Sequence, residues 1–200
     1  EMLGYIGHEK NTYSIDVKTI THRERPWVYN VWPGTGGAYM TLPWEVGPLA
    51  KLKQLIPGLR KLHTPPSIPP IAIACIEKRM PGEGIEAGML ILGYRMTGFH
   101  KKIVIVVDDD IDPTNTNDVI WAMCTRFDPR IDLETVDGCW STSLDPMCYD
   151  SDTDKRNSRV IIDACRPWNR RDEFPIVARS SRELDDRIRE KWAHVLPENS

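Results

Sequence analysis

The chain has 200 residues, 40% of them hydrophobic, and a formal net charge of -3 at pH 7. This length suits one domain, or one domain and part of another. Proteins that bind nucleic acid generally are usually basic, so the slightly acidic balance argues against a nucleic-acid partner. No run of residues approaches the roughly 18 apolar positions of a membrane-spanning helix, so no membrane partner is expected either.

The five cysteines bear on the cellular compartment. They are widely spaced, odd in number and include no Cys-x-x-Cys pair. This pattern favours reduced thiols in a cytoplasmic protein over a disulfide framework, and it does not suit a zinc ribbon.

The N-terminal part of the chain favours β structure followed by a helix. Tyr13, Ile15 and Val17 alternate with polar residues, and residues 26–32 form a second candidate strand. An apolar stripe then predicts a helix over residues 44–59.

The proline-rich stretch at 65–70 is a stiff connector, and beyond it strands and helices alternate. Strands are expected at 71–76, 103–107, 131–136 and 160–164, and helices at 86–94 and at 117–127, the second capped by Thr116 or Asn117. A long polar loop is expected over 138–156. This alternation predicts an α/β fold in which helices flank a mixed β-sheet.

Residues 103–107 are five consecutive β-branched residues, which predict a strand buried on both faces. Four aspartates follow at once: Asp108, Asp109, Asp110 and Asp112. They lie at the carboxyl edge of the sheet, where open α/β sheets place their sites, and could bind Mg²⁺, as in a magnesium-dependent phosphotransfer domain. Acidic groups also stabilise the positive pole of a following helix, and we favour this structural interpretation.

Two polar segments have a functional and a structural interpretation. His100, Lys101 and Lys102 precede the central strand and could contact an acidic substrate, or could be solvated there. Residues 140–146 combine aromatic, hydroxyl and small side chains, which could line a pocket or lie in a surface loop.

The chain closes with a well-marked helix. Ser180 and Glu183 fit a capping box, with serine at the N-cap and glutamate three residues later. Leu184, Ile188 and Trp192 follow at helical spacing and form one narrow apolar stripe. We expect this stripe to dock on a neighbouring chain.

Several motifs together resemble one enzyme family. Val-Asp-Asp-Asp-Ile-Asp at 107–112 is followed by Asp-Val-Ile-Trp-Ala at 118–122 and by Thr-Arg-x-x-Pro at 125–129. With Glu-Met-x-Gly-Tyr at 1–5 and the closing helix at 184–192, they resemble the C-terminal part of the UbiD-type decarboxylases, which use prenylated FMN.

The resemblance implies roles for individual residues. Glu1 matches the glutamate that protonates the substrate carbon after CO₂ leaves, a role for which a desolvated carboxyl group is suited. Six further residues match positions that line or cover the substrate: Met2, His100, Lys102, Trp140, Thr142 and Leu144.

The resemblance also implies that most cofactor ligands lie outside this chain. In the family, an arginine, a second glutamate and the ligands of Mn²⁺ or Mg²⁺ and of the flavin phosphate all precede the Glu-Met-x-Gly-Tyr segment, and K⁺ is a further candidate ion. No metal ligand is therefore expected here, and the aspartates of 108–112 are expected to be architectural.

The expected organisation and activity follow from this resemblance. Residues 1–47 would complete a β-rich (split-barrel) cofactor-binding domain, 48–179 would form a C-terminal α/β domain, and 180–200 an amphipathic helix for homo-oligomerisation. The expected activity is that of a carboxy-lyase acting on an aromatic or α,β-unsaturated carboxylic acid. The N-terminal portion of the same enzyme would be a partner of this chain, which alone is expected to be inactive. The alternative is a non-catalytic oligomerisation or regulatory module.

Overall fold

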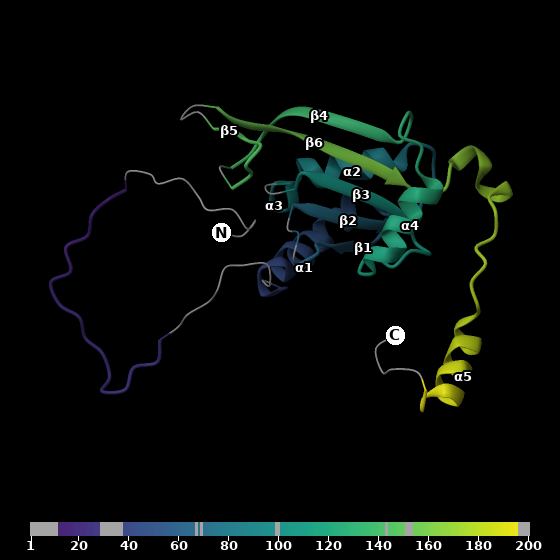
Figure 1. The fold of residues 1–200 in the computed structure, drawn as a ribbon. Coiled ribbons are helices and arrows are strands. Elements are labelled where there is room, and N and C mark those ends of the chain that lie inside the picture. The colour runs from purple at the N-terminus through teal and green to yellow at the C-terminus, as the bar shows by residue number, and fades with distance from the viewer. Residues whose placement is uncertain are drawn as a thin grey trace. The chain divides into compact units, whose positions relative to one another are not determined.

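The structure is a computed structural model, and its described residues are 12–28, 38–66, 68, 70–98, 101–142, 144–150 and 154–195. The chain divides into two compact units, Glu1–Asn169 and Arg170–Ser200. The first unit contains a β-sheet with helices, and the second contains an α-helix near the C-terminus (Figure 1).

The first unit is built on a six-stranded mixed sheet in the order β1-β2-β3-β6-β4, with β5 paired to β6. The strands are β1 (Leu59–His63), β2 (Ile71–Ile76), β3 (Ile103–Asp108), β4 (Leu133–Trp140), β5 (Tyr149–Asp150) and β6 (Lys155–Ala164). The pairs β2–β3 and β3–β6 are parallel, whereas β1 and β4 run antiparallel to their neighbours. The α/β prediction with a mixed sheet is therefore confirmed.

Strand β3 lies at the centre of this sheet and is buried along nearly its whole length. Its register places Ile103 beside Ile71 on one side and beside Val160 on the other. Both faces of β3 contribute to the core, which has two parts. Val104 and Val106 belong to one cluster, and Ile105 and Val107 belong to the other. This is the arrangement that five consecutive β-branched residues predict.

Helices cover the two faces of the sheet (Figure 1). They are α1 (Ala38–Leu55), α2 (Glu83–Gly93), α3 (Arg95–Gly98) and α4 (Thr116–Arg126). Leu52 of α1 and Ile91 of α2 pack in the cluster of Val104 and Val106, and Ala122 of α4 packs in the opposite cluster. Helix α2 lies so close to β6 that a Cβ atom at Gly88 would overlap the Ile161 side chain.

The boundary between the first helix and the first strand differs from the prediction. Helix α1 begins six residues earlier than expected and ends at Leu55, before the predicted end at 59, where the short strand β1 begins. Leu59 and Leu62 are buried and the two residues between them are exposed. Pairing with β2 satisfies the backbone groups of this segment, so it forms an edge strand although the apolar stripe continues the helical pattern.

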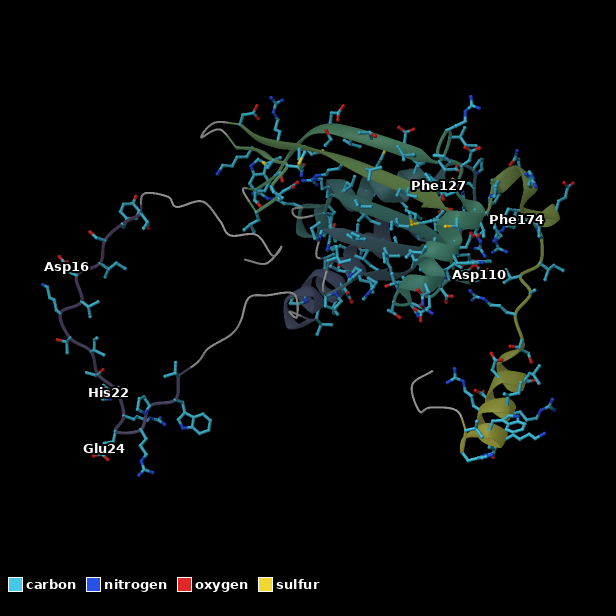
Figure 2. All side chains as sticks on the ribbon, in the orientation of Figure 1. Asp16, His22, Glu24, Asp110, Phe127 and Phe174 are labelled. Carbon is cyan, nitrogen blue, oxygen red and sulfur yellow. The ribbon has the colours of Figure 1, made fainter. Side chains whose placement is uncertain are left out.

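The N-terminal segment does not form the strand expected at Tyr13–Val17. Residues 12–22 have no regular secondary structure, and Tyr13 and Ile15 are 96% and 84% exposed. Asp16, His22 and Glu24 lie in this extended segment (Figure 2). A strand needs a hydrogen-bonded neighbour, and no described residue pairs with this segment. The candidate strand at 26–32 lies partly outside the described residues.

The expected polar loop over 138–156 is shorter than predicted, because strands take up both of its ends and part of its interior. Strand β4 continues to Trp140, β6 begins at Lys155, and β5 lies between them. Cross-strand pairing overrides the polar composition here because Lys155, Arg156 and Asn157 of β6 gain backbone partners in β4 or β5. Helix α4 also begins one residue early, because Asn115 is its N-cap and accepts a hydrogen bond from the backbone of Asn117.

The second unit contains helix α5 (Arg182–Trp192). Its N-cap is Ser181, one residue later than predicted, and the Ser181 hydroxyl accepts a hydrogen bond from the backbone N–H of Leu184. Leu184, Ile188 and Trp192 are all partly exposed on this helix.

The domain division at 1–47, 48–179 and 180–200 stays a prediction, although α1 runs across position 47 and the compact units divide before Arg170. None of the helices in the described ranges is both long and apolar enough to cross a membrane.

Candidate functional site

Two aspartates at the end of β3, Asp108 and Asp110, accept hydrogen bonds from an arginine side chain. Asp108 is 2% exposed, and its Oδ2 accepts hydrogen bonds from Arg126 Nη1 at 2.8 Å and from the Arg166 backbone at 2.7 Å. Both carboxylate oxygens of Asp110, which is labelled in Figure 2, accept hydrogen bonds from the same guanidinium, each at 2.7 Å. Hydrogen bonds from Arg126 lower the pKa of Asp110, as expected for a carboxylate that stays charged beside a cation.

This network gives Asp108 and Asp110 a structural role, but by a different route from the predicted one. Arg126 is the last residue of α4, so Asp108 and Asp110 hold the C-terminal end of this helix rather than its positive pole. Asp112 instead accepts hydrogen bonds from the backbone and hydroxyl of Thr114. Across the described residues, no group of three or more His, Cys, Asp or Glu side chains could hold a metal ion.

A second buried ion pair lies at the same edge of the sheet. Lys78 Nζ donates to Asp163 Oδ2 at 2.9 Å, and both side chains are less than 10% exposed. Burial by itself lowers the pKa of Lys78. Asp163 and other neighbouring groups together raise it by more, so the pKa is raised overall. The charged side chains at the carboxyl edge are thus paired with one another. This pairing indicates a role in stabilising the fold rather than in binding a ligand.

The opposite edge, where β3 begins, brings together residues that the sequence marked separately. Lys102 lies just before β3, and its Nζ donates to both carboxylate oxygens of Asp145 at 3.0 Å. Asp145 lies in the segment 141–148 that follows β4, together with Thr142 and Leu144. We call this segment, in its described part, the 141–148 loop.

Asp145 is the centre of the polar contacts in this loop. Besides Lys102, it accepts hydrogen bonds from Asn157 Nδ2 at 2.8 Å and from the Met147 backbone at 3.0 Å. Burial by itself raises the pKa of Asp145, but hydrogen bonds from Asn157, from the Met147 backbone and from Lys102 lower it overall. Asp145 is therefore held as a carboxylate.

The start of the loop is fixed by further hydrogen bonds. Ser141 is 5% exposed; its backbone N–H donates to the Lys155 carbonyl at 2.8 Å, and its hydroxyl accepts from Asn157 at 3.0 Å. Arg159 Nη2 donates to the Trp140 carbonyl at 2.5 Å. Within the loop, Thr142 Oγ1 accepts from the Leu144 backbone at 3.3 Å.

Lys101, next to Lys102, is in a very different environment. Lys101 is 1% exposed and its Nζ donates to the Thr64 hydroxyl at 2.9 Å. Glu45 of α1 accepts from the Thr64 backbone at 2.7 Å and lies 3.1 Å from His63 Nδ1. Burial lowers the pKa of Lys101 to about 7, although the charge of Glu45 opposes this shift. Lys101 therefore links the start of β3 to β1 and α1, whereas the partly exposed Lys102 links it to the 141–148 loop.

The structure thus groups four of the seven predicted site residues in one region: Lys102, Trp140, Thr142 and Leu144. Glu1, Met2 and His100 lie outside the described residues. Asn157 is a polar member of the region that sequence reasoning did not single out, and it marked Ser141 and Asp145 only as part of the segment 140–146. Asp145 lay in the marked segment 140–146, but no spacing rule pairs it with Lys102, 43 residues earlier.

The chemistry available in this region is mainly polar. It offers an ammonium paired with a carboxylate, hydroxyl groups, an amide and the apolar surfaces of Leu144 and Trp140, the latter 52% exposed. Such groups can orient a polar organic molecule. Lys102 and Asp145 offset each other's charge, so the described groups do not form a strongly charged anion site.

Comparison with known proteins gives a family and a set of similar structures. A family model described as the 3-octaprenyl-4-hydroxybenzoate carboxy-lyase C-terminal domain matches residues 38–164. The fold is similar to HmfF, a UbiD-class enzyme from Pelotomaculum thermopropionicum solved in complex with FMN, with 27% identity and a TM-score of 0.58, covering 74% of this chain and 31% of that one.

Two further structures show similarity of fold. Vanillic acid decarboxylase from Sedimentibacter hydroxybenzoicus in its closed form has 24% identity and a TM-score of 0.62, with 74% of this chain and 31% of that chain covered. The apo 3,4-dihydroxybenzoic acid decarboxylase of Klebsiella pneumoniae has 22% identity and a TM-score of 0.63, with coverage of 78% and 33%. The chain thus spans about a third of the length of these enzymes.

We predict that replacing Arg126 with methionine lowers the free energy of unfolding by about 3 kcal/mol, because it leaves the buried Asp108 with fewer donors. Arg60→Met is the matched control, since Arg60 pairs with Glu77 at an exposed position and should cost less than about 1 kcal/mol. Urea denaturation of the three proteins measures both changes. Equal losses in the two variants would contradict the structural role of the Arg126 network.

We also predict a pH dependence from Lys101. Its pKa of about 7 in the folded state is below the ordinary value of 10.5, so between these values the unfolded chain binds the proton more strongly. The free energy of unfolding should therefore rise with pH across this window, and Lys101→Met should remove a few kcal/mol of that rise. Lys51→Met, at an exposed position of α1, is the control. Denaturation at about pH 7 and about pH 9 gives the slope, and an unchanged slope in Lys101→Met would refute the prediction.

Proposed function

This chain belongs to the UbiD-type carboxy-lyase family and corresponds to a C-terminal part of such an enzyme. We propose that it functions within a non-oxidative decarboxylase. The substrate class is an aromatic or α,β-unsaturated carboxylic acid. The region around Lys102 and the 141–148 loop forms one wall of the substrate site. The reaction breaks the bond between the substrate carbon and its carboxylate, releases CO₂ and places a proton on that carbon.

The observation that carries this proposal is the grouping of Lys102, Thr142 and Leu144 at one edge of the sheet. The resemblance assigns these residues to the substrate from segments about forty positions apart, and the Lys102–Asp145 contact joins those segments. The solved enzymes with a similar fold include decarboxylases of vanillic acid and of 3,4-dihydroxybenzoic acid, which supports an aromatic acid.

Glu1 is the proposed proton donor. Its carboxyl group would deliver a proton to the substrate carbon after CO₂ leaves and would regain one before the next turnover. Such a group works best when desolvation brings its pKa towards the working pH. Met2 and His100 would complete the wall formed by Lys102, Thr142 and Leu144. A ring hydroxyl would suit the polar groups of this wall better than a purely apolar substrate would.

The proposed cofactor is prenylated FMN with Mn²⁺ or Mg²⁺, which would supply the electron-accepting chemistry of decarboxylation. The described residues do not fit a metal centre, since they form no group of three or more His, Cys, Asp or Glu ligands. The resemblance places the metal and phosphate ligands before Glu1, so no step through either group is assigned to the described residues. The solved HmfF complex contains FMN, which supports a flavin.

Helix α5 is the proposed oligomerisation element, with a second copy of the enzyme as partner. Leu184, Ile188 and Trp192 are between 37% and 45% exposed although they form one apolar stripe. Burying a stripe of this kind against another chain is a common source of association free energy. The cytoplasm is the proposed compartment.

The test of the catalytic assignment is Glu1→Gln in the complete enzyme. This substitution removes the transferable proton and keeps the shape of the side chain, so turnover should be lost while the flavin stays bound. Decarboxylation is followed by CO₂ release, and bound flavin by its absorbance after desalting. Glu190→Gln, on α5, is the matched control and should leave turnover unchanged. Near-normal turnover of Glu1→Gln would contradict the assignment of Glu1 as the proton donor.

The test of the oligomerisation assignment is Ile188→Glu in the same enzyme. A charge in the centre of the stripe should shift the particle to a smaller mass, since the buried apolar contact would then hold an unpaired carboxylate. Arg187→Glu introduces the same side chain at the neighbouring position outside the stripe and should keep the mass. Light scattering measures both, and an unchanged mass for Ile188→Glu would show that α5 is not the contact.

A further inference from the structure

The 141–148 loop depends on one carboxylate for its position. Asp145 accepts hydrogen bonds from Lys102, which precedes β3, from Asn157 within β6 and from the backbone of Met147 in its own loop. Strands β3 and β6 are adjacent and parallel, with Ile103 opposite Val160. Asp145 thereby fastens the loop to two neighbouring strands of the central sheet.

Asn157 has a special place in this arrangement because it holds the loop at two points. Its single amide nitrogen donates to Asp145 Oδ2 at 2.8 Å and to Ser141 Oγ at 3.0 Å. These acceptors lie on either side of Thr142 and Leu144 in the sequence. The orientation of the amide is fixed by chemistry, since an ionised carboxylate only accepts hydrogen bonds and must face the nitrogen.

The amide oxygen of Asn157 indicates why an asparagine stands here. Asn157 Oδ1 is buried and has no hydrogen-bond partner among the described residues. A buried acceptor without a donor destabilises the folded state. Leucine, with nearly the same shape, would avoid this cost but would lose both donated hydrogen bonds. The asparagine is therefore best explained by what its nitrogen holds in place.

We propose that Asn157 and Asp145 are positioning residues that set the 141–148 loop, and with it Thr142 and Leu144, against the substrate. In this arrangement Lys102 connects the start of β3 to the loop, and its ammonium group does not bind the substrate carboxylate. The presence of a substrate beside the loop rests on the proposed function. The position of the loop rests on the contacts of Asp145.

The charge balance supports this role for Lys102. Its ammonium contacts both oxygens of Asp145, and the Lys102 and Asp145 side chains are 34% and 15% exposed. A substrate carboxylate would have to compete with an ionised group already placed at hydrogen-bonding distance. The cationic side chain of Arg159 also lies near the loop, where it donates to the Trp140 carbonyl. The charge of Asp145 is thus already compensated by Lys102.

The test is Asn157→Asp in the complete enzyme, compared with Asn157→Leu. At about pH 8 the new carboxylate would face Asp145, and the repulsion should release the loop and raise KM about tenfold with a smaller change in kcat. At about pH 5.5 the new carboxyl group, whose pKa is raised by its neighbour, can donate again, and KM should return towards the wild-type value at that pH. Asn157→Leu cannot donate at either pH, so its KM should stay raised at both.

Ser158→Asp is the matched control, since it adds the same charge at the exposed neighbouring position of β6 and should leave KM and its pH profile unchanged. Hydrogen exchange of residues 141–148, compared with wild type at each pH, reports the loop independently of activity. Wild-type exchange in Asn157→Asp at about pH 8 would overturn the proposal. Faster exchange with an unchanged KM would support the clamp and would overturn the placement of the substrate beside this loop.

Discussion

The burial of β3 on both faces is the constraint from which the rest of this domain follows. A strand with apolar side chains on each side needs packing partners above and below, so helices must cover both faces of the sheet. Helices α1 and α2 meet this requirement on one face and α4 on the other. The polar and charged side chains of the neighbouring segments are then confined to the two ends of the strand. The polar and charged groups of the domain are therefore concentrated at the two ends of the central strands, which are the carboxyl and amino edges of the sheet.

The two edges differ in how their charges are used. At the carboxyl edge, Asp108, Asp110 and Arg126 form a buried network that joins β3 to the end of α4. At the other edge, Lys101 is enclosed by the α1 and β1 side while Lys102 reaches the 141–148 loop. Open α/β sheets usually place their sites at the carboxyl edge. Here that edge is occupied by structural ion pairs, and the residues assigned to the substrate gather at the amino edge.

Sequence patterns predicted the parts of this fold in which local preference and burial agree. Strand β2 has the predicted bounds of 71–76, β3 is one residue longer at its C-terminal end, and α4 is shifted by one residue at both ends. Strand β1 was missed because Leu59 and Leu62 are three residues apart, which is a helical spacing, and only pairing with β2, with an irregular register between Leu59 and Lys61, makes this segment a strand. The hairpin of β4 and β6 was missed because its outer half is polar and gains its stability from backbone pairing.

The candidate site was predictable only in part, for a related reason. Family motifs assign Lys102, Thr142 and Leu144, but hydrogen bonds between distant segments decide how these residues are held, and a single sequence contains no signal for such pairs. Asp145 and Asn157 became visible only once the sheet had placed them together. The aspartates after β3 are the converse case, because their pattern suggested a metal site and the fold supplied Arg126 as their partner.

The most direct measurement of this account is a crystal structure of the complete enzyme with an aromatic carboxylic acid bound. The account predicts that the ring lies within about 4 Å of Thr142 or Leu144, with Asp145 still joined to Lys102 and Asn157. A substrate bound at the other end of β3, beside Arg126, or one that touches no residue of the 141–148 loop, would contradict it.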